Sequence, residues 1–326
     1  MTVLTEQLEA RDLTHRRWAS AVTLIACASA LWMPALSLKG QMIIVGLAVG
    51  LLGFPHGALD PLVAALRSAD RSELNLGRFL GLYIGMALAV VLLWALSAPL
   101  GLALFLATSA LHFGLGDAPR SRVSRSPWRQ WARVVAHGAA PIILPAAAHP
   151  GNVAEVFGWL LDLPRASVEP WLISARPAAL AVWAACVVTG YFGAGRSEAS
   201  PRRGIQRGTQ RGIHGGLLEL GLLTATFVLL PPLLSFAVYF CAWHSVRHLI
   251  TVDAVLGPGL RARGLVVGVG VLAATGALVS LGHLAASDPA SIESLTRSLF
   301  VALAALTPPH MLVTAALARR VESLSE

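Results

Sequence analysis

The chain is dominated by apolar runs that are long enough to cross a lipid bilayer. A helix needs about 20 apolar residues to span a hydrocarbon core about 30 Å thick, and ten stretches of the 326-residue sequence approach that length. Charged residues make up only 13% of the chain, against about 25% in soluble domains. We therefore predict an all-α, polytopic transmembrane helix bundle: a single integral membrane domain, residues 1–326, that crosses the cell inner (plasma) membrane several times.

The ten expected spans cover most of the sequence. They are approximately residues 18–37, 41–65, 79–97, 99–117, 131–149, 173–194, 214–231, 233–255, 264–285 and 297–318. The seventh and eighth come from one continuous apolar run that is too long for a single crossing. We divide it at Pro231-Pro232, because tandem proline favours a tight connection.

The basic residues indicate how the spans are oriented, because cytoplasmic loops of membrane proteins carry an excess of Lys and Arg. Of the 25 basic residues, 20 fall in the N-terminal tail and in every second connection or terminus after it. This pattern places both termini in the cytoplasm. It predicts a cytoplasmic tail over about residues 1–17 and a mobile, Arg- and Gly-rich cytoplasmic loop over about residues 196–213. We therefore expect the net charge of +8 to orient the protein in the membrane and to contact anionic lipid, and not to bind nucleic acid.

Five histidines are expected at one depth in the membrane. The second, fourth, eighth and tenth spans all run from outside to inside, so position within a span gives depth. At about 1.5 Å per residue, the five lie within one or two helical turns of one level. They are His56, His112, His244, His248 and His310. Four helices thus contribute imidazoles to one layer, as a metal site in a bundle core requires.

Each histidine has an alternative interpretation when it is taken singly. An intramembrane histidine often serves only as a hydrogen-bond partner between helices. Ionisable groups in a membrane are nevertheless costly and mark functional sites, and His244 and His248, at positions i and i+4, share one helix face. The histidines expected to have structural or surface roles are His15, His137, His149, His214 and His283.

Two aspartates are candidates to orient the metal ligands. Asp60 and Asp117 follow the histidines of the second and fourth spans by four and five residues. A carboxylate in such a position could accept the other ring N–H of a ligating histidine and fix its tautomer. Asp117 lies near the membrane edge and could instead cap its helix. Arg247 is expected to pair with one of these carboxylates or with Asp253, or to extend toward the cytoplasm, turned away from the metal.

Aromatic residues flank the histidines and suit a polyene or another lipid, although helix packing is the simpler explanation for them. The candidates to line a substrate tunnel are Phe54, Phe113, Tyr191, Phe236, Tyr239, Phe240 and Trp243. Imidazole ligands suit Zn, Cu, Fe or Ni, so composition alone does not choose the metal.

Four motifs in this order resemble the Brp/Blh family of bacterial and archaeal β-carotene 15,15'-dioxygenases. They are Pro-His-Gly-Ala-Leu-Asp at residues 55–60, His112-Phe113-Gly114 with Asp117, Trp-His-Ser-Val-Arg-His at residues 243–248, and Pro309-His310-Met311. The resemblance implies an integral membrane enzyme that uses Fe(2+) and O2 to cleave β-carotene at its central double bond into two molecules of all-trans-retinal.

The resemblance also implies a ligand set. The iron ligands would be His56, His112, His244 and His248, which leaves His310, with Asp60 and Asp117, as candidates to lie behind the ligands. Two alternatives remain. One is another His-ligated membrane lipid oxygenase or hydroxylase, although the HxxHH pattern typical of di-iron desaturases is missing from the sequence. The other is a metal or proton transporter, which would need polar residues on both sides of the histidine layer.

Overall fold

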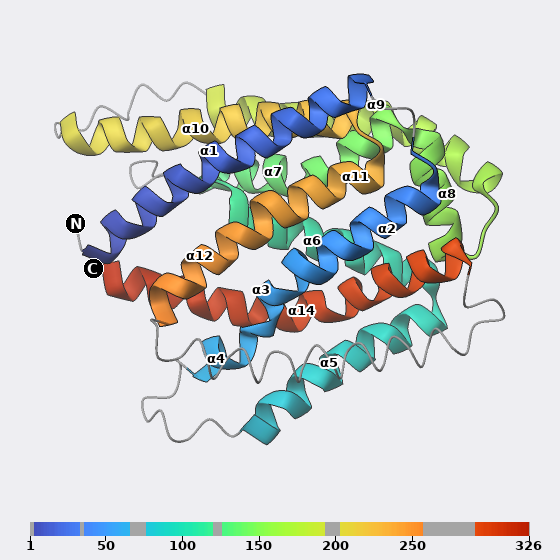
Figure 1. Cartoon of the computed structure of the whole chain (residues 1–326), viewed down its shortest axis with the longest axis horizontal. Helices are drawn as coiled ribbons and strands as arrows, with labels where there is room; N and C mark the ends of the chain where they lie inside the picture. The colour runs from blue at the N-terminus through green and yellow to red at the C-terminus, as the bar shows by residue number, and fades with distance from the viewer. Residues whose placement is uncertain are drawn as a thin grey trace.

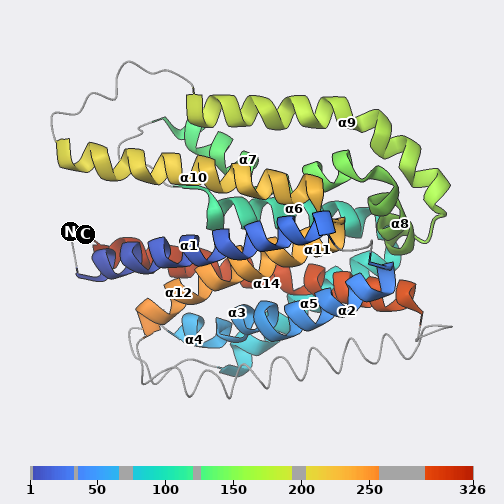
Figure 2. The ribbon, with the colours of Figure 1, turned by 45° about the horizontal axis from the view of Figure 1, so that its top comes forward.

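The computed structural model describes residues 3–32, 36–65, 76–119, 126–192, 203–256 and 291–325, and within these ranges it contains helices and no strand. The helices lie side by side along the long axis of the molecule (Figure 1). A second view shows the same arrangement, and in both views the start of α1 and the end of α14 lie together at one end of the bundle (Figure 2). The predicted all-α bundle is thus confirmed.

The described residues form ten helical segments, several of which are interrupted by a wide π-helical turn (η). In chain order they are α1 (Val3–Trp32); α2 (Leu38–Ala48) with η1 (Val49–Gly53), α3 (Phe54–Ala58) and α4 (Asp60–Ala65); α5 (Leu76–Leu96); α6 (Ala98–Asp117); α7 (Pro127–Ala148); α8 (Pro150–Leu161); α9 (Arg165–Val187) with η2 (Val188–Phe192); α10 (Arg203–Leu229); α11 (Pro232–Ala237) with η3 (Val238–His244) and α12 (Ser245–Leu256); and α14 (Ile292–Ser325).

Six of these segments are long and apolar enough to cross a membrane. They are Leu38–Ala64, Gly77–Leu96, Ala98–Asp117, Pro127–Ala148, Arg165–Phe192 and Ile292–Arg319, and α10 contributes a shorter apolar stretch, Ile213–Leu229. The segments α1 and α11 to α12 are less apolar, because they carry charged residues and histidines. The number of helices agrees with the expected ten, but the match is not one to one. Helix α8 was not expected, and the span expected at residues 264–285 lies outside the described residues.

The segments expected to form a tail and a loop are largely helical, and one expected boundary is confirmed. The tail expected over residues 1–17 is helical from Val3 onward, as the first part of α1. Most of the loop expected over residues 196–213 is also helical, because α10 begins at Arg203. Its arginines and glutamines are good helix formers, and extending an existing helix costs far less than starting one. The division at Pro231-Pro232 is confirmed, since α10 ends at Leu229 and α11 begins at Pro232.

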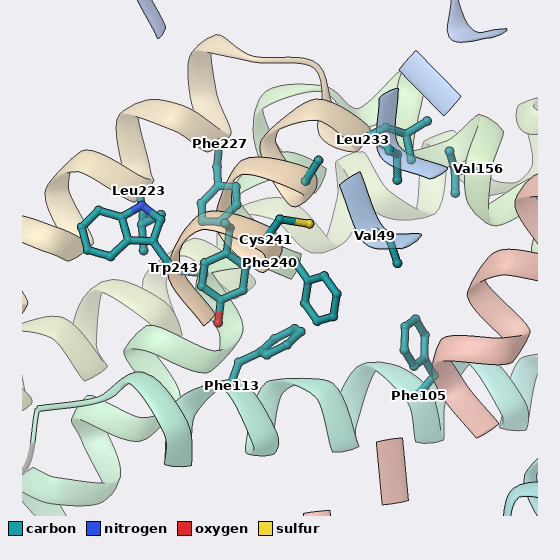
Figure 3. Close-up of a cluster of buried hydrophobic side chains, with 14 of the residues drawn as sticks. Val49, Phe105, Phe113, Val156, Leu223, Phe227, Leu233, Phe240, Cys241 and Trp243 are labelled. Carbon is teal, nitrogen blue, oxygen red and sulfur yellow. The ribbon is translucent and has the colours of Figure 1, made fainter. Parts of the chain in front are cut away.

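Helix α1 packs against the segment that carries His244. The indole N–H of Trp243 donates to Thr23 Oγ1 at 2.9 Å, and His15 Nε2–H donates to the carbonyl of Ala242 at 2.8 Å. His15 is therefore buried, and the expectation that it lies at the surface is wrong. Trp243 belongs to an aromatic core that also contains Phe113 and Phe240 (Figure 3).

Helices α6 and α7 approach so closely that two glycines leave no room for a side chain. A Cβ atom on Gly138 would lie 1.8 Å from the carbonyl oxygen of Ala110, and one on Gly114 would lie 2.1 Å from the carbonyl oxygen of Val134. Small residues at such contacts allow membrane helices to approach backbone to backbone. Because α6 also carries His112, this contact fixes the position of that imidazole.

The substitution Gly138→Ala should therefore destabilise the fold by about 1–3 kcal/mol, the usual cost of overpacking, because the added methyl meets backbone that cannot rotate away. The measurement is the thermal unfolding midpoint of the purified protein in detergent. Gly81→Ala is the matched control, because a Cβ atom there meets nothing within 4 Å. Equal midpoints for the two variants would contradict the close contact between α6 and α7.

Candidate metal centre

Five histidine side chains converge in the core of the bundle. The ring centroid of His56 lies 5.8 Å from that of His244, 5.7 Å from that of His248 and 4.8 Å from that of His310. The ring of His112 lies 4.6 Å from that of His244 and 5.0 Å from that of His310. The prediction that these five side chains occupy one level is confirmed. They come from α3, α6, η3, α12 and α14.

Wide turns lead into two of these histidines. The π turn η1 ends at Gly53, just before the short helix of His56, and η3 ends at His244 itself. Such a turn holds an extra residue and therefore rotates the side chains that follow it, which is why π turns often occur at functional sites. The sequence analysis did not find these turns. Pro55, in the first turn of α3, could have indicated the first of these turns, because proline has no N–H to donate to the preceding helical turn.

Asp117 orients His244. Its Oδ2 atom lies 3.1 Å from His244 Nδ1 and accepts the hydroxyl of Tyr239 at 2.7 Å, while its Oδ1 accepts from Arg247 at 2.8 Å. Asp117 therefore accepts a hydrogen bond from a histidine, as expected, and this histidine is His244 and not His112 on the same helix as Asp117. Five residues turn a helix by about 140° beyond one full turn, so Asp117 faces away from the imidazole on its own helix.

Asp60 orients His310. The Nδ1 atom of His310 lies 2.8 Å from Asp60 Oδ1 and 2.9 Å from Oδ2, and the hydroxyl of Tyr83 donates to Oδ2 at 2.9 Å. His56, four residues before Asp60, instead donates its Nδ1–H to the carbonyl of Gly53. The helix is interrupted between α3 and α4, so residues 56 and 60 do not share a face as they would in a continuous helix.

Arg247 forms a partly buried charge network on one side of the histidines. It donates to Asp117 and also to Glu219 Oε2 at 2.8 Å, and Arg16 lies 3.8 Å from the same Glu219 oxygen. The expected pairing with an aspartate is confirmed, whereas Asp253 pairs with Arg11. Glu219 was not identified from the sequence. It could have been, because an acidic residue within an apolar membrane segment marks a candidate functional position.

The histidines present nitrogen atoms suited to a metal ion. Ring nitrogens of His56, His112 and His310 lie within 4.8 Å of one another, and Asp60, His248 and His310 form a second such group. The Nε2 atoms of His248 and His310 are buried and have no hydrogen-bond partner among the described residues. Buried polar atoms are normally satisfied, so these two fit the role of metal ligands. The His112 and His244 Nε2 atoms, 2.8 Å apart, face each other at the same place.

An apolar pocket opens directly beside the histidines. It is lined by Gly53, His56, Gly57, Ala58, Tyr83, Phe105, Ser109, His112, Phe113, Phe236, Phe240, Leu303, Leu306, Thr307 and His310. Phe105 precedes His112 by seven residues, and Leu303 precedes His310 by seven. The pocket therefore extends about 10 Å from the histidine layer along the bundle. This i, i+7 spacing, which marks one helix face, would have identified both residues from the sequence.

Only some of the expected tunnel residues line this pocket. Phe113, Phe236 and Phe240 do so. The other aromatic candidates bond elsewhere: the hydroxyl of Tyr239 to Asp117, the indole of Trp243 to Thr23, and the hydroxyl of Tyr191 to His137 Nε2 at 2.5 Å. The side chain of Phe54 lies outside the described part of the structure.

The substitution Asp117→Asn should lower the affinity of the centre for a divalent metal by about 10–100-fold, the usual effect of removing a carboxylate behind a ligating histidine. The measurement is a competition titration of the purified protein against a chelator of known affinity. Asp162→Asn is the control, because the Asp162 side chain is 85% exposed and pairs with Arg297 at the surface. An affinity that does not change in Asp117→Asn would show that this carboxylate does not support a ligand.

Comparison with known proteins agrees with this site. The family model for beta-carotene 15,15'-dioxygenase matches residues 47–318. The beta-carotene 15,15'-dioxygenase of uncultured marine bacterium 66A03 is 27% identical over 282 residues, which cover 84% of this chain and 94% of the relative. The probable beta-carotene 15,15'-dioxygenase Blh of Halobacterium salinarum is 29% identical over 294 residues, which cover 80% of this chain and 79% of the relative.

No solved structure shows significant similarity. Because the family match runs from α2 to α14 and includes all five clustered histidines, this membrane protein belongs to the β-carotene 15,15'-dioxygenase family.

Proposed function

We propose that this protein cleaves β-carotene at its central 15,15' double bond, using Fe(2+) and O2, to give two molecules of all-trans-retinal. The observation that carries the proposal is the histidine cluster, which opens directly onto an apolar pocket lined by phenylalanines. In the reaction one C=C bond is broken and two C=O bonds form. Each product takes one oxygen atom of O2, so the reaction needs no external reductant.

His56, His112, His244 and His248 are the proposed iron ligands. Bound Fe(2+) would supply the redox chemistry that brings O2 and an electron-rich alkene to react. The chain contributes the orientation of the ligands. His244 Nδ1–H is held by Asp117 and His56 Nδ1–H by Gly53. Each of these contacts leaves the lone pair of Nε2 directed toward the centre.

The pocket is proposed to hold the polyene with its central double bond beside the histidines. Phe113 and Phe240 lie at the cluster, with ring centroids 4.8 and 6.0 Å from that of His244. Flat aromatic walls match a conjugated chain in shape and exclude water. A carotenoid is about as long as the bilayer is thick and partitions into lipid, so a pocket inside the bundle spares the substrate any passage through water.

The distribution of polar groups favours an enzyme over a transporter. Beyond the histidines, the pocket is lined mainly by Phe105, Phe236, Leu303 and Leu306. The charged residues Arg247 and Glu219 lie in the other direction, toward the C-terminal end of α12. A transit path for ions would need polar groups on both sides of the layer.

We also propose that both termini lie in the cytoplasm and that the protein resides in the inner (plasma) membrane. The start of α1 and the end of α14 lie at one end of the bundle (Figure 2). The arginines at the start of α1 and α10 and at the end of α14 belong to that end. An excess of basic residues is typical of the cytoplasmic side.

Expression in cells that accumulate β-carotene should bleach the orange pigment and produce retinal, measured by chromatography of the extracted pigments. His248→Ala should abolish both changes, because it removes a proposed ligand. His214→Ala, a substitution of an exposed histidine on α10, should retain them. Pigment that persists beside well-expressed, folded protein would overturn the proposed reaction.

Leu303→Trp should reduce cleavage at least tenfold while leaving metal content unchanged, because the larger ring fills the pocket one helix face away from the histidines. The measurements are retinal formation and metal content in the same purified sample. Leu312→Trp is the control, because Leu312 lies on the same helix with 60% of its surface exposed. Full activity of Leu303→Trp would show that the substrate does not occupy this pocket.

A further inference from the structure

We infer that His310 is a fifth imidazole of the metal centre, and that Asp60 and Tyr83 form a relay that positions it. The inference rests on the proposed function, since it adds a residue to the iron site proposed above. It goes beyond the four histidines that the sequence motifs assign as ligands, and it gives roles to Asp60 and to a tyrosine on α5.

The position of His310 is that of a ligand. Its ring centroid lies 4.8 Å from that of His56, 5.0 Å from that of His112 and 5.1 Å from that of His248. These separations are as short as those among the four assigned histidines. Its nitrogen belongs to both groups of side chains that could hold an ion.

The free nitrogen of His310 points to a ligand as well. Its Nδ1 atom is bonded to Asp60, and its Nε2 atom is buried without a hydrogen-bond partner among the described residues. The His310 side chain is only 6% exposed, so this atom lies inside the bundle and not at its surface. A metal-ligating histidine almost always donates its other ring N–H to a carboxylate, a carbonyl or water, and His310 has this arrangement.

The relay behind His310 repeats the one behind His244. The hydroxyl of Tyr83 donates to Asp60, which accepts from His310, just as the hydroxyl of Tyr239 donates to Asp117, which accepts from His244. The same three residue types therefore hold an assigned ligand and His310. The tyrosine hydroxyl occupies a lone pair of the carboxylate and thereby fixes its orientation toward the imidazole.

The two relays differ in where their tyrosines lie. Tyr83 lines the apolar pocket, whereas Tyr239 belongs to the charge network with Arg247. A substitution of Tyr83 therefore alters the orientation of His310 through Asp60, from the side of the pocket. We place Tyr83 and Asp60 as positioning residues, which act on the centre through His310.

The test uses Co(II) as a spectroscopic probe of the purified full-length protein in detergent. The wild-type protein should bind Co(II) with an absorption spectrum typical of a centre with several imidazole ligands. His310→Ala should still bind Co(II), but about tenfold or more weakly, with shifted and more intense visible bands because the coordination number falls. Added imidazole should restore the wild-type spectrum, an outcome that a merely structural role would not produce.

Tyr83→Phe keeps the ring and removes only the hydroxyl, so it tests the relay even where His310→Ala fails to fold. It should weaken Co(II) binding and shift the bands in the same direction, to a smaller extent. Tyr191→Phe is the matched control, because that hydroxyl bonds to His137 outside the cluster, and it should leave the spectrum unchanged.

The outcomes separate the two proposals. Unaltered affinity and spectrum in a folded His310→Ala or, where that variant does not fold, in Tyr83→Phe would overturn the inference while leaving the four-histidine site intact. A wild-type protein that binds no Co(II) or Fe(II) at all would overturn the metal centre of the proposed function, and this inference with it. Two equivalents of bound Co(II), of which His310→Ala loses one, would assign His310 to a second ion with Asp60 and overturn the single-centre form proposed here.

Discussion

The buried carboxylate of Asp117 is the interaction on which the rest of the site depends. It accepts hydrogen bonds from Tyr239, His244 and Arg247, so one side chain joins the end of α6 to η3 and α12. A charge in an apolar bundle is tolerated only when it is fully paired. Arg247 continues the pairing to Glu219 on α10. The orientation of one imidazole is therefore tied to the packing of three helical segments.

The backbone makes a similar contribution where glycines and wide turns replace regular packing. Gly114 and Gly138 let α6 and α7 meet without side chains between them, and this sets the depth of His112. The turns η1 and η3 release His56 and His244 from regular helical spacing. Imidazoles from separate helices thus meet in the core of the bundle, where metal sites of helix bundles are built.

Apolar length and loop charge were sufficient to predict an all-helical bundle, the break at Pro231-Pro232 and the common level of five histidines. They failed where the outcome depends on rotation about a helix axis. Asp60 and Asp117 follow His56 and His112 in sequence, but a break in the helix and a rotation of about 140° direct them to His310 and His244. Sequence separation does not show which helix lies opposite. The part of the expected loop from Arg203 onward is helical, because glycine and charge content do not prevent an adjoining helix from extending.

The pocket and the charge network extend from the histidine layer in opposite directions along α6 and its neighbours. Phe105 and Leu303 lie toward the N-terminal ends of their helices, whereas Asp117 and Arg247 follow the histidines. A lineage can therefore change the size or shape of the molecule it accepts through apolar substitutions that leave every ion pair in place. Substitutions are then tolerated more readily in one half of the bundle than in the other, because a change to one member of the charge network leaves the charge of its partner unpaired.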